Sequence, residues 1–166
     1  VPTAAMWDLI EQPGSKVGPH WRWLAEPAPG PENRIKARPE ALIDETMASW
    51  TATKDLESFD GRALAHYRTF VQDPTRIAAM CEDYRAGATL DRQADLADRA
   101  AGKHIAGPVL AVWGSHGIPA ASSDPLALWR PYAPEVQGQA LKGGHFLPEE
   151  NPIDTGAALL RFFQAA

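Results

Sequence analysis

The chain has 166 residues, a length typical of one domain, with 45% hydrophobic residues and a formal net charge of −5 at pH 7. The acidic balance argues against nucleic-acid binding as the main function. No apolar run reaches transmembrane length, and the N-terminus lacks a signal-peptide pattern, so we expect no membrane partner. Cys81 is the single cysteine, which excludes an internal disulfide and indicates a cytoplasmic protein.

The first hundred residues read as helices only. A short amphipathic helix is expected over residues 6–12, ended by Pro13-Gly14, and a second over residues 19–26. Between this helix and the next, residues 27–31 read Pro-Ala-Pro-Gly-Pro and predict an ordered turn without regular structure.

Three longer helices follow, each with a recognisable start. Pro39 opens the first, Asp60 caps the second, and Asp73-Pro74 begins the third. Helical spacing predicts an inward face for each, and a polar helix is expected over residues 91–101. The predicted inward residues are Leu42, Ile43, Thr46, Met47 and Trp50, then Leu64, Tyr67, Phe70 and Val71, then Ile77, Met80, Cys81, Tyr84 and Ala88.

The character of the sequence changes after residue 100. Residues 108–114 form a continuous apolar run ended by glycine, typical of a parallel strand that is buried on both faces. Asp124-Pro125 starts a helix, residues 135–141 predict a second strand, and Asn151-Pro152 starts the last helix. The apolar side of that helix is expected to comprise Ile153, Leu159, Leu160 and Phe163.

Two parallel strands cannot form a sheet that buries both faces and pairs its edges. We therefore predict an α/β fold class, the C-terminal part of an α/β-hydrolase whose N-terminal half is missing from this chain. Residues 1–100 would form the helical cap, or lid, and residues 101–166 the last two parallel strands and the terminal helix of the core. The alternative is a self-contained, mostly helical domain.

One loop near the C-terminus stands out, Gly143-Gly144-His145-Phe146, between the second strand and the last helix. An α/β-hydrolase carries its general base at this place, and glycines allow the sharp turn. The alternative is a loop histidine without a role. A His base needs a nucleophile and an orienting carboxylate, but Gly-x-Ser-x-Gly is absent and Asp124 is occupied as a helix cap. The orienting acid is expected at, or just upstream of, Val1.

Three motifs together resemble the haloacetate dehalogenases, in particular the fluoroacetate dehalogenases. The spacings, 64 residues from His20 to Tyr84 and 61 from Tyr84 to His145, also fit that family. The resemblance covers nearly the whole chain. The motifs are His20-Trp21 with Leu24-Ala25-Glu26-Pro27-Ala28-Pro29, then Met80-Cys81-Glu82-Asp83-Tyr84-Arg85-Ala86-Gly87-Ala88, then Gly144-His145-Phe146-Leu147-Pro148-Glu149-Glu150.

The resemblance implies a mechanism in which an Asp displaces halide from a haloacetate and forms an ester, which water activated by a His then hydrolyses. His145 would be that His, while the nucleophile and the Arg residues that hold the substrate carboxylate would belong to the missing half. His20, Trp21 and Tyr84 would donate hydrogen bonds to the halide, each contributing about 2–4 kcal/mol to the transition state. For Trp21 and Tyr84 the alternative is simple packing in the cap. Trp50 faces inward, which favours the core or the cap interface, and we retain it as a candidate for the substrate pocket.

The implied partners are a small anionic halogenated acid, the N-terminal half of the same fold and a second copy of the chain, with no cofactor. No His, Cys, Asp or Glu set has metal-ligand spacing, so no metal is expected. His66, His104 and His116 have no partner pattern and read as surface residues. Two rival functions stay open: another capped hydrolase, such as an epoxide hydrolase that uses cap tyrosines, and a non-enzymatic binding module.

Overall fold

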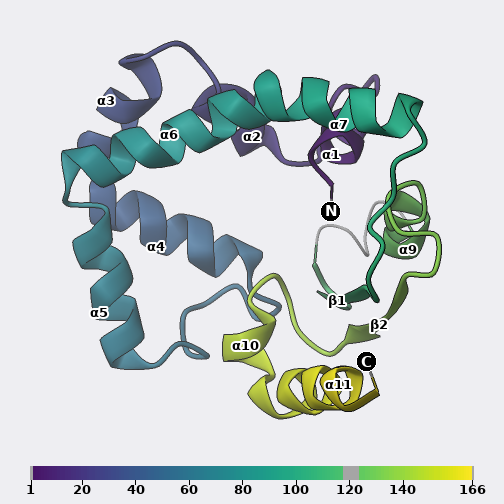
Figure 1. The fold of residues 1–166 in the computed structure, drawn as a ribbon. Helices are drawn as coiled ribbons and strands as arrows, with labels where there is room; N and C mark the ends of the chain where they lie inside the picture. Colours follow the sequence, from purple (N-terminus) through teal and green to yellow (C-terminus); the bar gives the residue numbers. More distant parts are fainter. Residues whose placement is uncertain (1, 118–123, 166) are drawn as a thin grey trace.

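The computed structural model describes residues 2–117 and 124–165, with helices in the first part of the chain and both strands in the second (Figure 1). The elements of the first part are α1 Thr3–Ile10, α2 Pro19–Leu24, α3 Gly30–Lys36, α4 Pro39–Trp50, α5 Gly61–Phe70, α6 Pro74–Ala88 and α7 Leu90–Ala100. Those of the second part are β1 Leu110–Gly114, α9 Pro125–Trp129, β2 Gln137–Leu141, α10 Leu147–Glu150 and α11 Pro152–Ala165.

Helix α6 is the centre of the cap and packs against α2, α3, α7 and α1. Its buried residues Ile77 and Cys81 meet Leu24 of α2 and Ile35 of α3 in one apolar cluster. Ile77 and Cys81 are one helical turn apart on the predicted inward face of α6, so the spacing correctly identified the face that packs.

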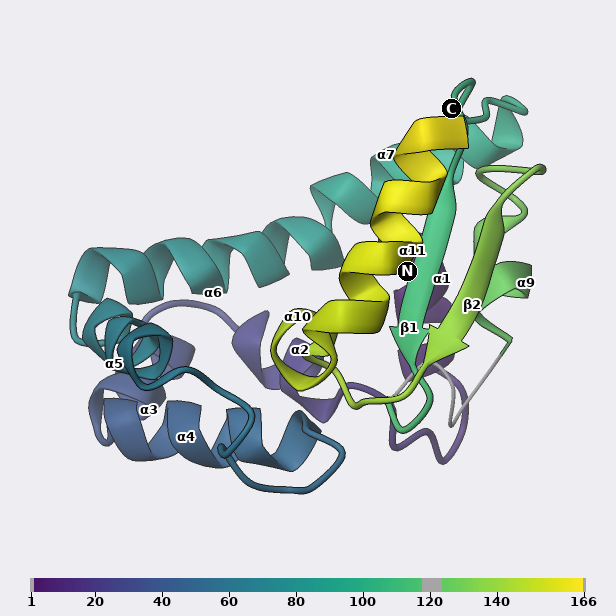
Figure 2. The ribbon, with the colours of Figure 1, turned by 90° about the horizontal axis from the view of Figure 1, so that it is seen from below.

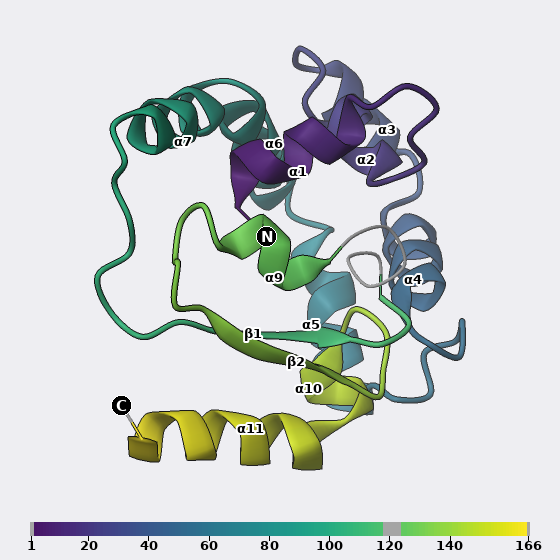
Figure 3. The ribbon, with the colours of Figure 1, turned by 90° about the vertical axis from the view of Figure 1, so that its right-hand side faces the viewer.

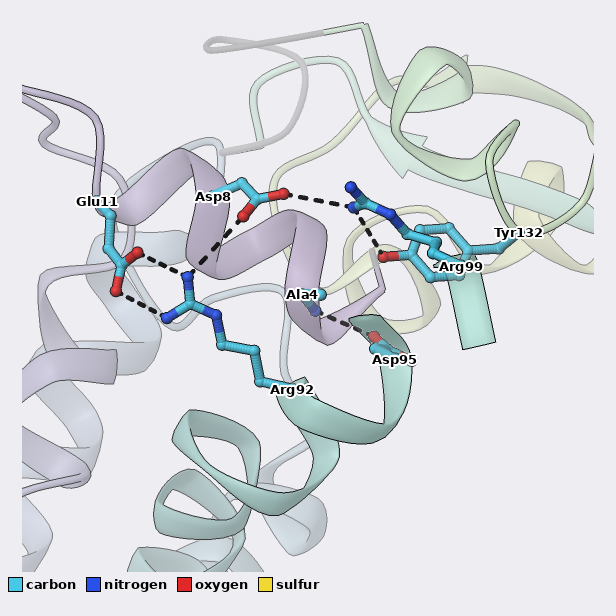
Figure 4. A network of polar contacts seen from close by, with 7 residues as sticks. All are labelled: Ala4, Asp8, Glu11, Arg92, Asp95, Arg99 and Tyr132. Atoms are coloured by element: carbon cyan, nitrogen blue, oxygen red, sulfur yellow. Dashed lines mark hydrogen bonds and ion pairs between the residues drawn. The ribbon is translucent and has the colours of Figure 1, made fainter. Parts of the chain in front are cut away.

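Helix α1 has a second, smaller core and a polar seam against α7. Met6, Trp7 and Ile10 are buried together, with Trp21 packed against them. On its other side, carboxylates of α1 meet arginines of α7 (Figure 4). The pairs are Glu11 with Arg92 and Asp8 with Arg99, and Asp95 accepts a hydrogen bond from the backbone N–H of Ala4. The apolar core and this seam together hold α1 across the cap.

The predicted helix starts are confirmed by hydrogen bonds. The Asp60 carboxylate accepts from the N–H groups of Arg62 and Ala63, which begin α5. Asp73 and Asp124 accept in the same way at the starts of α6 and α9. Side-chain oxygens here satisfy N–H groups that have no partner within the helix.

The two strands form a parallel pair, with Leu110 beside Gln137 and Gly114 beside Leu141. Helices α9 and α11 lie on opposite faces of this pair (Figure 3). Figure 2 shows the cap helices α3 to α5 at one end of the molecule and the strands at the other, with α10 between them. No helix in the described part of the chain is long and apolar enough to cross a membrane.

Residues 108–114 read as a strand that needs neighbours on both sides, and the described residues supply a neighbour on one side only, as the prediction of a partial fold implies. Most of β1 is only half-buried, because among the described residues it pairs with β2 alone. The apolar run shows that this strand can be buried on both faces. Whether it is buried depends on the elements that pack against it.

Other details also differ from the predictions. The first helix, expected over residues 6–12, spans Thr3–Ile10. Residues 27–31 are not all turn, because α3 begins at Gly30 and proline fits the first turn of a helix. Residues 147–150, expected as loop, form the short helix α10. Phe70, expected to point inward on α5, is 39% exposed; it belongs to neither apolar cluster, and the Arg76 guanidinium lies over its ring.

The predicted apolar side of α11, Ile153, Leu159, Leu160 and Phe163, is largely uncovered in the described chain. Ile153 is 82% exposed and Phe163 71% exposed, while the buried residues of α11 are Thr155 and Ala158. Helical periodicity identifies the apolar face of a helix, but a second element must cover that face. In the described chain no element does so for Ile153, Leu160 and Phe163.

Candidate active site

The His145 loop is held against the end of α4. The backbone N–H of His145 donates to the carbonyl oxygen of Trp50 at 2.9 Å. A Cβ atom on Gly144 would lie 2.5 Å from the Trp50 oxygen and 2.5 Å from the Ala52 nitrogen, so only glycine fits this approach. Gly143 adopts φ of +150°, which side chains rarely tolerate. The glycines of the motif therefore allow the loop to contact the cap.

The end of β1 supports the loop from the other side. A Cβ atom on Gly114 would lie 1.8 Å from the Gly144 carbonyl oxygen, so this contact also requires glycine. The N–H of Ser115 donates to Leu141 and that of His116 to Gly143. The loop is thus fixed between the end of β1 and the end of α4.

The three predicted halide donors converge in the cap. His20 and Trp21 lie in the first turn of α2, which follows Gly18 in a left-handed conformation, and Tyr84 lies on α6. The ring centroids of His20 and Tyr84 are 5.8 Å apart, and those of Trp21 and Tyr84 are 5.6 Å apart, both edge to face. The structure therefore brings these three side chains together, although they come from separate helices.

Trp50 connects this group to the predicted base. Its ring centroid lies 4.7 Å from that of His20 and 5.3 Å from that of His145. The order in space is Trp21, Tyr84, His20, Trp50 and His145, so all five predicted site residues belong to one continuous aromatic row.

Burial and, to a smaller extent, the neighbouring His145 together lower the pKa of His20 to about 4. Burial also lowers the pKa of His145, whereas the negative charge of Glu150 opposes that shift. One part of the His145 side chain is exposed, and the rings of Trp50 and Phe146 pack against the rest. Both imidazoles are therefore neutral at pH 7, the state in which a His can accept a proton or donate one N–H.

The pKa of Tyr84 is raised, first by burial and then by the negative charge of Asp83. Its hydroxyl consequently keeps its proton at neutral pH. A neutral phenol beside a neutral imidazole and an indole makes a group of N–H and O–H donors without net charge, a chemistry that suits a small anion.

A cavity of about 330 Å³ opens beside this group, among α2, α4 and α6. His20, Trp50 and Tyr84 line one side of it, and apolar side chains line most of the remainder. Trp21 and His145 do not border it. Its other walls include Trp23, Leu24, Ile35, Leu42, Ile43 and Met80.

Two further residues of the motifs have contacts that the sequence analysis did not assign. The Glu150 carboxylate accepts hydrogen bonds from backbone N–H groups on both sides of His145. Arg85 bonds to Glu32 and to the Glu26 carbonyl oxygen, so it ties α6 to the α2–α3 connection. The signal for Glu150 was an acid five residues after the histidine, but only the tertiary structure reveals its partners.

The remaining histidines make none of the ring contacts that form the row. His66, His104 and His116 are exposed. Over residues 2–117 and 124–165, no three His, Cys, Asp or Glu side chains are grouped as metal ligands would be.

Comparison with known proteins yields relatives along the whole chain. A fluoroacetate dehalogenase from Burkholderia sp is 32% identical over 166 residues, which is all of this chain and 54% of that protein. A solved structure from Nostoc sp PCC 7120, described as a "putative alpha/beta hydrolase", is 39% identical with a TM-score of 0.91 and matches 99% of this chain and 55% of that one. No protein-family model matches the chain.

A second solved structure, a "putative epoxide hydrolase" from Pseudomonas aeruginosa, is 35% identical with a TM-score of 0.89 and matches 99% of this chain and 54% of that one. The chain thus spans about half the length of the relatives it matches. These matches confirm both expectations drawn from the sequence, the resemblance to the fluoroacetate dehalogenases and the partial fold with two parallel strands.

Proposed function

Because the chain has the cap and the C-terminal strands of an α/β-hydrolase fold, we propose that it belongs to a hydrolase that removes halide from a haloacetate. The product would be the hydroxy acid, glycolate for fluoroacetate. The substrate would be a small anionic acid, and the nucleophile would come from the N-terminal half of the fold. A division into a cap over residues 1–100 and a core part over 101–166, and a homodimer, belong to the same proposal.

The observation that carries the proposal is the convergence of His20, Trp21 and Tyr84 beside a neutral histidine on the terminal loop. Packing alone would explain any one of these rings. Here three hydrogen-bond donors of different chemistry come together from two helices, and Trp50 connects them to His145. A shared anionic ligand explains this grouping better than packing does.

In the first step a carboxylate oxygen attacks the carbon that carries the halogen. The new C–O bond forms as the carbon–halogen bond breaks, and the halide leaves with the electron pair. Fluoride is strongly hydrated, so it leaves slowly unless other donors replace water. The His20, Trp21 and Tyr84 side chains would supply those donors in a site that burial keeps poor in water.

In the second step His145 would accept a proton from water as the water oxygen attacks the ester carbonyl carbon. Collapse of this intermediate breaks the bond between the carbonyl carbon and the ester oxygen. The hydroxy acid leaves with that oxygen, which takes the proton from His145, and the nucleophile is regenerated. His145 needs to be unprotonated for this role, in agreement with its lowered pKa.

The test uses the complete gene product that contains this chain, with a fluoride electrode for release from fluoroacetate. The His145→Asn variant should release a single equivalent of fluoride and then stop, because the ester forms but is not hydrolysed. Intact-mass spectrometry should detect that ester. His66→Asn is the matched control, since His66 is exposed on α5, and should turn over normally. No fluoride release by the folded wild-type protein contradicts the proposal.

An epoxide hydrolase is the second candidate, favoured by the Pseudomonas aeruginosa structure and by the protonated hydroxyl of Tyr84. That reaction would need Tyr84 as a proton donor to the epoxide oxygen and would leave the pair His20-Trp21 without a role. Turnover of an epoxide but of no haloacetate would decide for it. Ligand binding without turnover, unchanged in His145→Asn, would indicate a binding module.

A further inference from the structure

Glu150 is the last residue of α10, and both of its carboxylate oxygens bond to backbone groups. Oε2 accepts from the N–H of Ala52 at 2.7 Å and from the N–H of Gly144 at 2.9 Å. Oε1 accepts from the N–H of Phe146 at 3.1 Å. Among the described residues no arginine or lysine forms an ion pair with this carboxylate.

The three donors come from two places in the chain. Gly144 and Phe146 flank His145, so the carboxylate holds the backbone on both sides of the imidazole. Ala52 lies in the turn after α4, two residues beyond Trp50. The N–H of His145 itself donates to Trp50. All three successive N–H groups of residues 144–146 therefore have partners that hold the loop in place.

We propose that Glu150 is a positioning residue, whose carboxylate fastens the His145 loop to the end of α4 so that the imidazole keeps its place relative to the cap donors. This inference rests on the proposed role of His145. It differs from the role of an orienting acid, which would bond the imidazole ring itself, because Glu150 acts through backbone groups.

Catalysis by a general base depends on the exact position of its side chain. A general base loses much of its effect when it is displaced by about 1 Å from its working position. Residues 142–146 lie outside the helices and strands, so their placement depends on such contacts. Hydrogen bonds from N–H groups to a charged carboxylate are roughly twice as strong as neutral ones, and three of them converge here.

Electrostatics supports the same assignment. Among the side chains of the described residues, the charge that acts on the His145 imidazole is that of Glu150. The Glu150 charge raises the pKa of His145 against the lowering by burial, so the base keeps more of its proton affinity.

Glu149 provides a matched control. It precedes Glu150 in α10, and its Oε1 accepts from the Tyr67 hydroxyl at 3.0 Å. It thus also ties α10 to the cap, but through a side chain on α5, and it bonds no N–H group of the His145 loop. Glu149→Gln tests the effect of losing a charge in α10 without loosening that loop.

The experiment has two readouts on the complete gene product. Hydrogen–deuterium exchange measures the backbone groups of Gly144 and Ala52 without any need for activity. Single-turnover kinetics with fluoroacetate separates fluoride release from ester hydrolysis. In Glu150→Ala we expect exchange at Gly144 to speed up about tenfold or more. Ester hydrolysis should slow about tenfold or more while fluoride release changes less than about twofold, because His145 acts only in the second step.

Glu150→Gln keeps one acceptor oxygen, so both of its readouts should lie between those of the wild type and Glu150→Ala. If Glu150→Ala fails to fold, the comparison of Glu150→Gln with the wild type tests the proposal. Glu149→Gln should match the wild type. Unchanged exchange at Gly144, or equal slowing of both chemical steps, overturns the proposal. If His145→Asn still hydrolyses the ester, the proposed function is wrong. Hydrogen–deuterium exchange at Gly144 and Ala52 then still tests whether Glu150 holds the His145 loop in place.

Discussion

His20 and His145 are two imidazoles that share one aromatic row yet differ in surroundings. His20 is enclosed by Trp50 and Tyr84, and its pKa falls to about 4, mainly through burial. His145 is partly exposed and has the Glu150 carboxylate nearby. These surroundings suit His20 to the role of a permanent neutral donor and His145 to that of a base.

The lowered pKa of His20 predicts a dependence of stability on pH. The unfolded chain takes up the proton near pH 6.5 but the folded chain only near pH 4, so acidification through this window favours unfolding. Between pH 7 and pH 5 the wild type should lose about 1–2 kcal/mol more of its unfolding free energy than His20→Gln does. Urea unfolding at both pH values measures this, and equal losses would contradict the prediction.

The proposed role of Trp21 as a hydrogen-bond donor to the halide predicts a defect that depends on the halide. Trp21→Phe keeps an aromatic ring against Tyr84 but removes the indole N–H. Turnover of fluoroacetate should fall about 100-fold, and that of bromoacetate much less, because fluoride needs hydrogen-bond donors most. Trp129→Phe is the control: Trp129 lies on α9 and does not belong to the aromatic row. Equal losses for both halides would indicate that Trp21 has a packing role only.

At the scale of elements, the His145 loop is defined by close backbone contacts rather than by apolar packing. Gly144 touches the end of α4, and Gly114 at the end of β1 touches Gly144. The loop therefore joins the cap to the strands, and small changes in its backbone should reach the site.

Gly144→Ala should be strongly destabilising. The new Cβ atom would lie 2.5 Å from two backbone atoms that cannot rotate away, so the loop must shift. We expect a loss of about 2–4 kcal/mol in unfolding free energy. Gly156→Ala in α11 has open space around its Cβ position and should stabilise by up to about 1 kcal/mol. Chemical denaturation compares the two, and equal stability would refute the close approach.

At the scale of the whole molecule, an apolar surface on α11 remains uncovered in this chain. Leu160 is 63% exposed and Phe163 71% exposed on one helix. Uncovered apolar groups of this size promote association. The 166-residue chain should therefore self-associate as its concentration rises, and the double variant Leu160→Lys with Phe163→Lys should do so less. Leu90→Lys, 71% exposed on α7, is the control; sedimentation velocity measures all three.

Several features of this protein could be predicted from short stretches of sequence. Asp60, Asp73 and Asp124 could be recognised as helix caps because capping depends on a few neighbouring residues. The inward face of α6 followed from helical spacing. The two strands and the glycine-rich loop before the last helix were also evident, since their signals lie within short stretches.

Only the tertiary structure could decide which apolar faces are covered by other elements and which distant side chains meet. The exposed side of α11 and the half-buried β1 depend on which elements lie beside them. Trp50 could not be placed between His20 and His145 from spacing, nor could Glu150 be matched to Ala52, because each pair is far apart in sequence. The sequence by itself determined which side chains were chemically able to form a site; long-range packing decided which of them meet, because contacts between distant segments leave no periodic signal in the chain.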